Sequence, residues 1–113
     1  MLRIHDDMLE AIVAMRPMLA GIERCDCDLA RQLRRAASSV VLNLAEGSGS
    51  FGRVRTVRYR TALGSARESF ACLRTAEAYG YIGAIPGSVV TTMNRVIGTL
   101  VRRLRAAGLS AAR

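Results

Sequence analysis

Four arginines and no acidic residue lie between residues 52 and 60, directly after a segment rich in glycine and serine at residues 47–52. Guanidinium groups bind phosphates through paired hydrogen bonds, and the free amides at the start of a helix also attract anions. A helix that begins near Arg53 would therefore form a phosphate-binding surface with Arg53, Arg55, Arg58 and Arg60. The alternative is a solvated face or a subunit interface, in which these arginines pair with the acidic first helix of a neighbouring copy.

Arginines also recur every seven residues, at Arg53, Arg60, Arg67 and Arg74. On a straight helix such positions drift by only about 20° per heptad, so they lie along one side. This row could follow a nucleic-acid backbone, and Arg67 therefore joins the candidate nucleic-acid-binding residues. An ordinary exposed face, with Glu68 and Glu77 beside the arginines, is the interpretation that we favour for the row as a whole.

No catalytic or metal-binding constellation is present in the sequence. His5 is the only histidine, so no Ser-His or Cys-His pair and no Glu-x-x-His metal site can form. In an antiparallel pair of helices, Glu46 and Glu68 would lie about 14 residues apart along the axis, or roughly 21 Å. The sequence has three cysteines, Cys25, Cys27 and Cys72. Their spacing fits no zinc site, and we expect all three to be free thiols. The sequence thus predicts no enzyme, no metal and no cofactor.

The charge is strongly positive and unevenly distributed. The 113 residues hold 17 basic side chains, all arginine, against nine acids, for a net charge of +8. The first 28 residues hold three arginines and six acids, a net −3, which leaves +11 for the remainder. This asymmetry indicates a polyanionic partner, a charge-paired self-assembly, or both. Neither a membrane span nor a signal peptide is predicted, and we expect a cytoplasmic protein.

Helical periodicity explains how these residues are positioned. Between residues 27 and 46, apolar side chains recur at intervals of three and four: Leu29, Leu33, Ala36, Ala37, Val40, Val41 and Leu44. Similar patterns predict helices at about 6–22, 53–79 and 87–107. In the first helix, Leu9 and Val13 are expected to widen the buried stripe. The prediction is one all-α domain over residues 1–113, an antiparallel up-down-up-down four-helix bundle.

Glycine and proline mark the expected helix ends. Pro17 should kink the first helix, and Asp26 or Asp28 should cap the second. Gly47 and Gly80 are expected to end the second and third helices in the left-handed conformation that glycine tolerates.

Three ordered motifs resemble those of a known family. The first motif consists of residues 32–37, Ser39 and residues 43–47. The second consists of residues 62–68, and the third of residues 79–82. Together they are similar to the hallmark of the 23S rRNA intervening-sequence proteins, over about residues 25–82. The motif positions expected to have structural roles are Arg34, Arg35, Asn43, Glu46, Gly47 and Glu68. From the antiparallel geometry, Glu68 should face Gln32 and pair with Arg34 or Arg35, and Asn43 should hydrogen-bond to backbone.

The resemblance implies a ring-shaped homopentamer. A related branch, the accessory variability determinant proteins of diversity-generating retroelements, assists reverse transcriptases and binds nucleic acid. Charge and resemblance together predict a small basic homo-oligomer that binds RNA or DNA through backbone phosphates without base specificity, as an accessory factor. The alternative is a structural or protein-interaction adaptor, for example a partner of a reverse transcriptase, with no nucleic-acid binding of its own.

Overall fold

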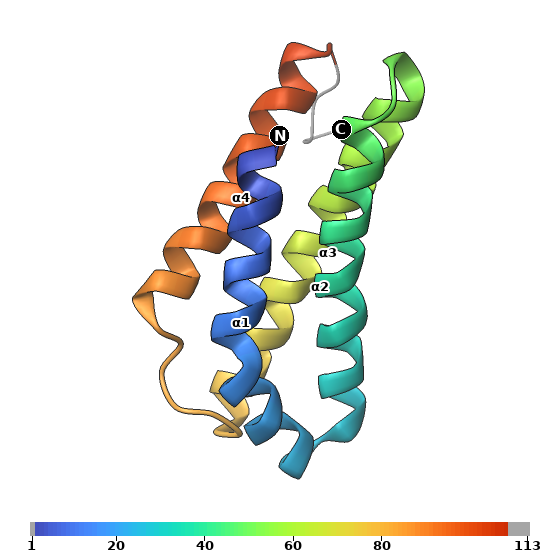
Figure 1. Cartoon of the computed structure of the whole chain (residues 1–113). Coiled ribbons are helices and arrows are strands. Elements are labelled where there is room, and N and C mark those ends of the chain that lie inside the picture. The colour runs from blue at the N-terminus through green and yellow to red at the C-terminus, as the bar shows by residue number, and fades with distance from the viewer. Residues whose placement is uncertain (1, 109–113) are drawn as a thin grey trace.

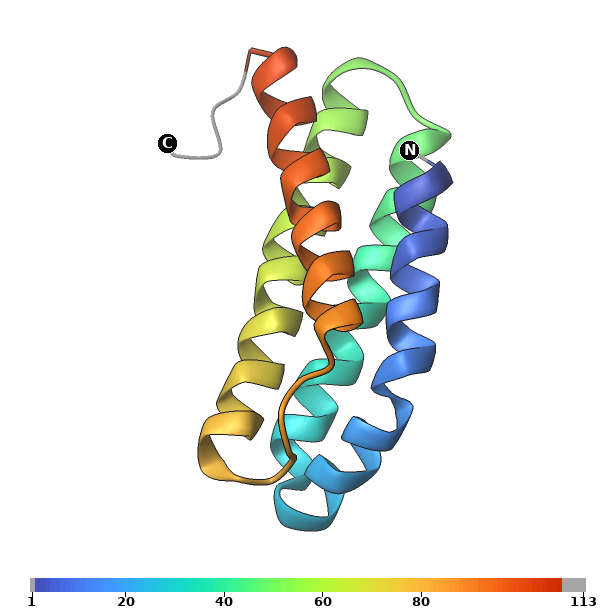
Figure 2. The same ribbon diagram turned by 90° about the vertical axis from the view of Figure 1, so that its left-hand side faces the viewer.

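The computed structural model describes residues 2–108 and contains four helices. They are α1 (Leu2–Cys25), α2 (Cys27–Ser48), α3 (Gly52–Tyr79) and α4 (Gly87–Ala106). Figures 1 and 2 show them side by side in an elongated molecule, which measures 42 × 23 × 22 Å. The all-α prediction is confirmed, since the described part of the chain holds no strand. None of the four helices is long and apolar enough to cross a membrane, as judged over residues 2–108.

The interior is aliphatic, and each helix contacts two neighbours around it. The largest side chains that are fully buried come from all four helices: Met8, Met15, Ile22, Leu33, Leu44, Leu73, Met93 and Leu100. The predicted stripe of α2 is confirmed except at Val41, which is only partly buried. The stripe of α1 is narrower than expected, because Leu9 and Val13 are 43% and 59% exposed. Ile4, Ala11 and Met18 occupy the buried side of α1 instead.

Helix α1 begins and ends beyond the predicted limits of residues 6 and 22. It runs from Leu2 to Cys25 and includes Pro17 within the helix. Proline removes one backbone donor and crowds the preceding turn. The residues that follow it, Met18 and Ile22, are buried in the core. Residues on both sides of Pro17 are thus anchored in the core, and Figure 2 shows the last turns of α1 bent away from the line of its first half.

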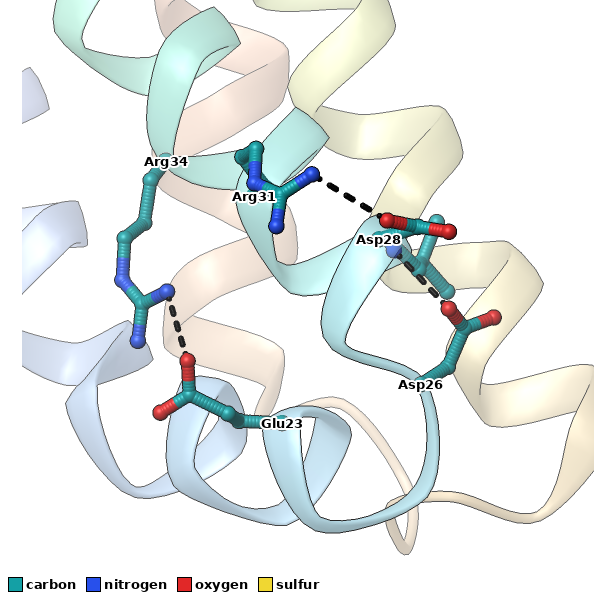
Figure 3. Close-up of polar contacts among 6 residues, drawn as sticks. Glu23, Asp26, Asp28, Arg31 and Arg34 are labelled. Atoms are coloured by element: carbon teal, nitrogen blue, oxygen red, sulfur yellow. Dashed lines mark hydrogen bonds and ion pairs between the residues drawn. The ribbon is translucent and has the colours of Figure 1, made fainter.

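Asp26 alone connects α1 to α2 and caps the second helix. Its carboxylate accepts a hydrogen bond from the amide of Leu29 at 3.0 Å (Figure 3). A cap of this kind stabilises a helix by about 1 kcal/mol. Beside it, Arg34 donates to Glu23 of α1 at 2.9 Å. The Arg34 guanidinium, through this hydrogen bond and its charge, holds the pKa of Glu23 below its ordinary value.

Gly47 does not cap α2, contrary to the prediction. It lies inside the helix, which continues to Ser48, and Gly49 follows at φ −90°. A side chain at position 47 would collide with Tyr59 of α3, because an added Cβ would come within 2.7 Å of Cδ1 and still closer to Cε1. Tyr59 is only 4% exposed. Glycine is therefore needed here for the close approach of α2 and α3.

Gly80 caps α3 as predicted. It has φ +78°, and its amide bonds back to Glu77 at 3.0 Å, while the amide of Tyr81 bonds to Ala76 at 3.0 Å. These two bonds form a Schellman cap. The chain then passes residues 81–86 before α4 begins.

Candidate nucleic-acid interface

The start of α3 and the end of α4 meet at one end of the bundle (Figure 1). Arg55, Thr56 and Tyr59 line one cleft there together with Arg103 and Leu104. We call residues 52–60 and 100–106 the basic end. These two segments contain no acid and seven arginines: Arg53, Arg55, Arg58, Arg60, Arg102, Arg103 and Arg105. Arg103 was not among the candidate residues predicted from the sequence.

Two of the five predicted phosphate-binding residues are engaged within the molecule. Arg55 is half-buried, and its Nε donates to the carbonyl of Gly47 at 3.2 Å. That carbonyl lies in the last turn of α2, where backbone acceptors lack helical partners and the helix dipole is negative. Arg58 pairs with Glu46 at 3.0 Å. Both side chains thus connect α3 to the end of α2.

The other three predicted residues are exposed. Arg53, Arg60 and Arg67 have no carboxylate within ion-pair distance in the described part of the chain. The fourth member of the seven-residue row, Arg74, lies 4.0 Å from Glu77 and over the ring of Phe70. The row is therefore neutralised at the far end of α3 and unneutralised toward its start.

Glu68 is exposed and forms no ion pair with the arginine row in the described part of the chain. It lines a surface depression between α2 and α3 with Gln32, Arg35 and Ser65, so the predicted facing of Glu68 and Gln32 is confirmed. The predicted ion pair is wrong, since neither Arg34 nor Arg35 lies within ion-pair distance of Glu68 in residues 2–108. Successive residues of a helix point about 100° apart, and Arg34 points to Glu23 on α1.

Asn43 bonds to backbone as predicted. Its Nδ2 donates to the carbonyl of Ser39 at 2.8 Å and also reaches the Ser39 hydroxyl at 3.1 Å. The Ser65 hydroxyl of α3 donates to the same Ser39 oxygen at 2.7 Å. Ser39 contacts Ser65, and Glu46 contacts Arg58, so α2 and α3 run antiparallel. These motif residues join the two helices, and the two glutamates share no site.

Cysteine accessibility separates the three thiols. Cys25 and Cys27 are exposed, whereas Cys72 is buried. Burial raises the pKa of the Cys72 thiol, and the nearby Glu68 carboxylate raises it further. A raised pKa leaves less reactive thiolate at any given pH.

We therefore expect a maleimide at pH 7 to label Cys25 and Cys27 rapidly and Cys72 only when the protein unfolds. Mass spectrometry of the labelled peptides measures this order, and early labelling of Cys72 would contradict it.

The two ends of the bundle differ in charge. At the turn between α1 and α2, together with the end of α3, four arginines accompany four acids: Arg24, Arg31, Arg34 and Arg74, with Glu23, Asp26, Asp28 and Glu77. Three ion pairs form there: Glu23–Arg34, Asp28–Arg31 and Glu77–Arg74. We call this the balanced end. The basic end has one acidic contact, from Glu46 to Arg58.

Comparison with known proteins gives one match. A family model described as 23S rRNA-intervening sequence protein matches residues 14–101, more than three quarters of the chain. No curated protein and no solved structure matches the chain. The matched range contains the whole of α2 and α3, and with them the motif residues that join these two helices.

Proposed function

The chain belongs to the 23S rRNA-intervening sequence protein family, and from this premise we propose that it binds RNA or DNA through backbone phosphates, without base specificity. It does so as a homo-oligomeric accessory protein of the cytoplasm. The basic end and the adjoining arginines of α3 form the binding surface.

The observation that carries this proposal is the unneutralised charge on α3. Arg53, Arg60 and Arg67 lie along one side of the helix, without acidic partners among the described residues. Three of the four arginines at the balanced end are paired instead. An exposed cationic row that the molecule does not neutralise attracts a polyanion over long range. Its members are spaced along the helix axis by about 10 Å, which suits successive contacts to an extended backbone.

Base recognition has little support in the side chains nearby. Proteins that bind single-stranded nucleic acid stack its bases on aromatic rings. Tyr59 is buried against Gly47, and the exposed ring of Phe51 is covered on one side by Arg55, 5.7 Å from its centroid. Phosphate contacts fix position and carry no sequence information. The proposal is therefore restricted to backbone binding.

The proposal includes an up-down-up-down order of the helices and assembly into a ring-shaped homopentamer. One residue connects α1 to α2, and three residues connect α2 to α3, so each helix must turn back along its predecessor. The acidic first segment and the basic remainder of the chain favour contacts between copies.

Salt-dependent binding tests this function. Fluorescence anisotropy with two 30-nucleotide RNAs of unrelated sequence, and with the matching DNAs, should give similar affinities for both sequences. Affinity should fall steeply with salt, with a slope of log K on log salt near −0.7 for each single-strand phosphate contact. No binding at 50 mM salt, together with stable capture of a purified reverse transcriptase, would support the adaptor function instead.

A further inference from the structure

The polar depression between α2 and α3 has no part in the proposed function. Its volume is about 370 Å³, which is within the range of pockets that hold small molecules. Ala36, at 4% exposure, is its one apolar lining residue. The other five are polar: Gln32, Arg35 and Ser39 of α2, with Ser65 and Glu68 of α3. Spacings of three and four place each set on one face of its helix, so both helices present a polar face to the depression.

The base of the depression holds a hydroxyl hydrogen that has no acceptor. Ser39 and Ser65 are partly buried, whereas the longer side chains around them are exposed. The Ser39 oxygen accepts from the Ser65 hydroxyl at 2.7 Å and from the Asn43 amide at 3.1 Å. A serine hydroxyl has one hydrogen to donate, and that of Ser39 enters no hydrogen bond within residues 2–108. The hydroxyl is thus held in place by its neighbours and is available to a ligand.

Opposite charges line the depression and neither is neutralised. Arg35 lies on the α2 side and Glu68 on the α3 side. No ion pair joins the two, and neither pairs with any other residue in the part of the chain that the structure describes. The α2 side therefore offers a cation and a hydroxyl donor, and the α3 side offers a carboxylate.

We infer that this depression binds a small zwitterion, a free amino acid, with its carboxylate on Arg35 and Ser39 and its ammonium group on Glu68. A guanidinium group binds a carboxylate through paired hydrogen bonds, and an ammonium group donates charge-assisted hydrogen bonds to a carboxylate. A phosphate is a poorer occupant, because Glu68 repels its negative charge. The lining residues all lie outside the basic end, so the inference is independent of the proposed nucleic-acid binding.

Nuclear magnetic resonance of the full, isotope-labelled chain tests the inference. Exposed charges are weakened by solvent, so the titrations extend to millimolar concentrations of ligand. The probes are glycine, β-alanine and γ-aminobutyrate, in which the distance between the two charges increases. Acetate, phosphate and methylammonium carry one kind of charge and serve as controls. At least one amino acid should shift the amide signals of residues 32–39 and 65–68 saturably, and bind about tenfold more tightly than any control, the value of one charge-assisted hydrogen bond.

Two variants remove one charge each from the depression. Arg35→Gln and Glu68→Gln should each weaken binding of the best amino acid about tenfold. Both side chains are exposed and unpaired in residues 2–108, so circular dichroism should show unchanged helix content. Arg31→Gln and Glu10→Gln make the same changes at exposed positions outside the depression and should leave the affinity unchanged.

Three results would overturn the inference. The first is that no amino acid shifts the signals around the depression, and the second is that either depression variant binds as tightly as the wild type. The third is that acetate or phosphate binds as tightly as the best amino acid, which would describe an anion site in which Glu68 has no part. Anisotropy with RNA is measured separately, so failure of one proposal leaves the other standing.

Discussion

Replacing Arg53 and Arg60 with glutamine is expected to flatten the dependence of nucleic-acid affinity on salt by about one to two units of slope per engaged subunit. Each phosphate contact releases condensed counterions, and the number released sets the slope. Both arginines are exposed and have no acidic partner in residues 2–108, so their loss removes no internal ion pair. The loss should be the same for unrelated sequences, because phosphate contacts do not specify bases. Anisotropy titrations between 50 and 200 mM salt measure the slope.

The balanced end provides a matched control. Replacing Arg31 and Arg74 with glutamine removes the same total charge, but both side chains are paired, with Asp28 and Glu77. This control should leave the slope within error of the wild type. Equal flattening in both double variants would mean that net charge alone matters. No change in the Arg53/Arg60 variant, with its oligomeric state intact, would move the binding surface away from α3.

Gly47→Ala should lower the free energy of unfolding by about 1–3 kcal/mol, the usual cost of overpacking a well-filled interior. Alanine is intrinsically better than glycine inside a helix by roughly 1 kcal/mol, so the expected sign depends on the contact with Tyr59. An added Cβ would lie within 2.7 Å of the Tyr59 ring and 3.3 Å from Cβ of Arg58. The buried ring cannot swing away, and α2 and α3 must separate. Urea denaturation followed by circular dichroism measures the loss.

Gly64→Ala is the control for this prediction. Gly64 is an exposed residue of α3, and nothing lies within 4 Å of the Cβ it would gain. Stability should rise there by up to about 1 kcal/mol. Tyr59→Leu in the Gly47→Ala background should recover part of the loss, which a double-mutant cycle would report as coupling. Equal effects of alanine at positions 47 and 64 would contradict the close-approach explanation.

Periodicity was sufficient to predict the four helices because most buried positions recur every three or four residues. It failed at Leu9 and Val13, since hydrophobicity indicates that a residue can be buried and does not say that a neighbour covers it. Gly47 was assigned to the wrong role for a related reason. A glycine near a helix end suits a cap or a close contact, and only the position of Tyr59 on the next helix distinguishes the two.

The candidate site was predictable in location and only partly in detail. The arginine-rich start of α3 is evident from composition. The engagement of Arg55 with the Gly47 carbonyl, and of Arg58 with Glu46, depends on side-chain direction across a helix pair. Arg103 entered the site because α4 ends beside the start of α3. Residues so far apart in the sequence gave no local signal that they would lie together.

The unequal charge of the two ends has a consequence for any ring whose rotation axis runs along the bundle. Rotation about such an axis never inverts a subunit, so every basic end appears on the same side. The assembly is then a two-faced disc, with one cationic face and one face on which arginines and acids are equal in number. A strand of nucleic acid that crosses the cationic face would contact the basic ends of several subunits at once, which multiplies weak individual contacts. The opposite face stays free for a different class of molecule while the first is occupied.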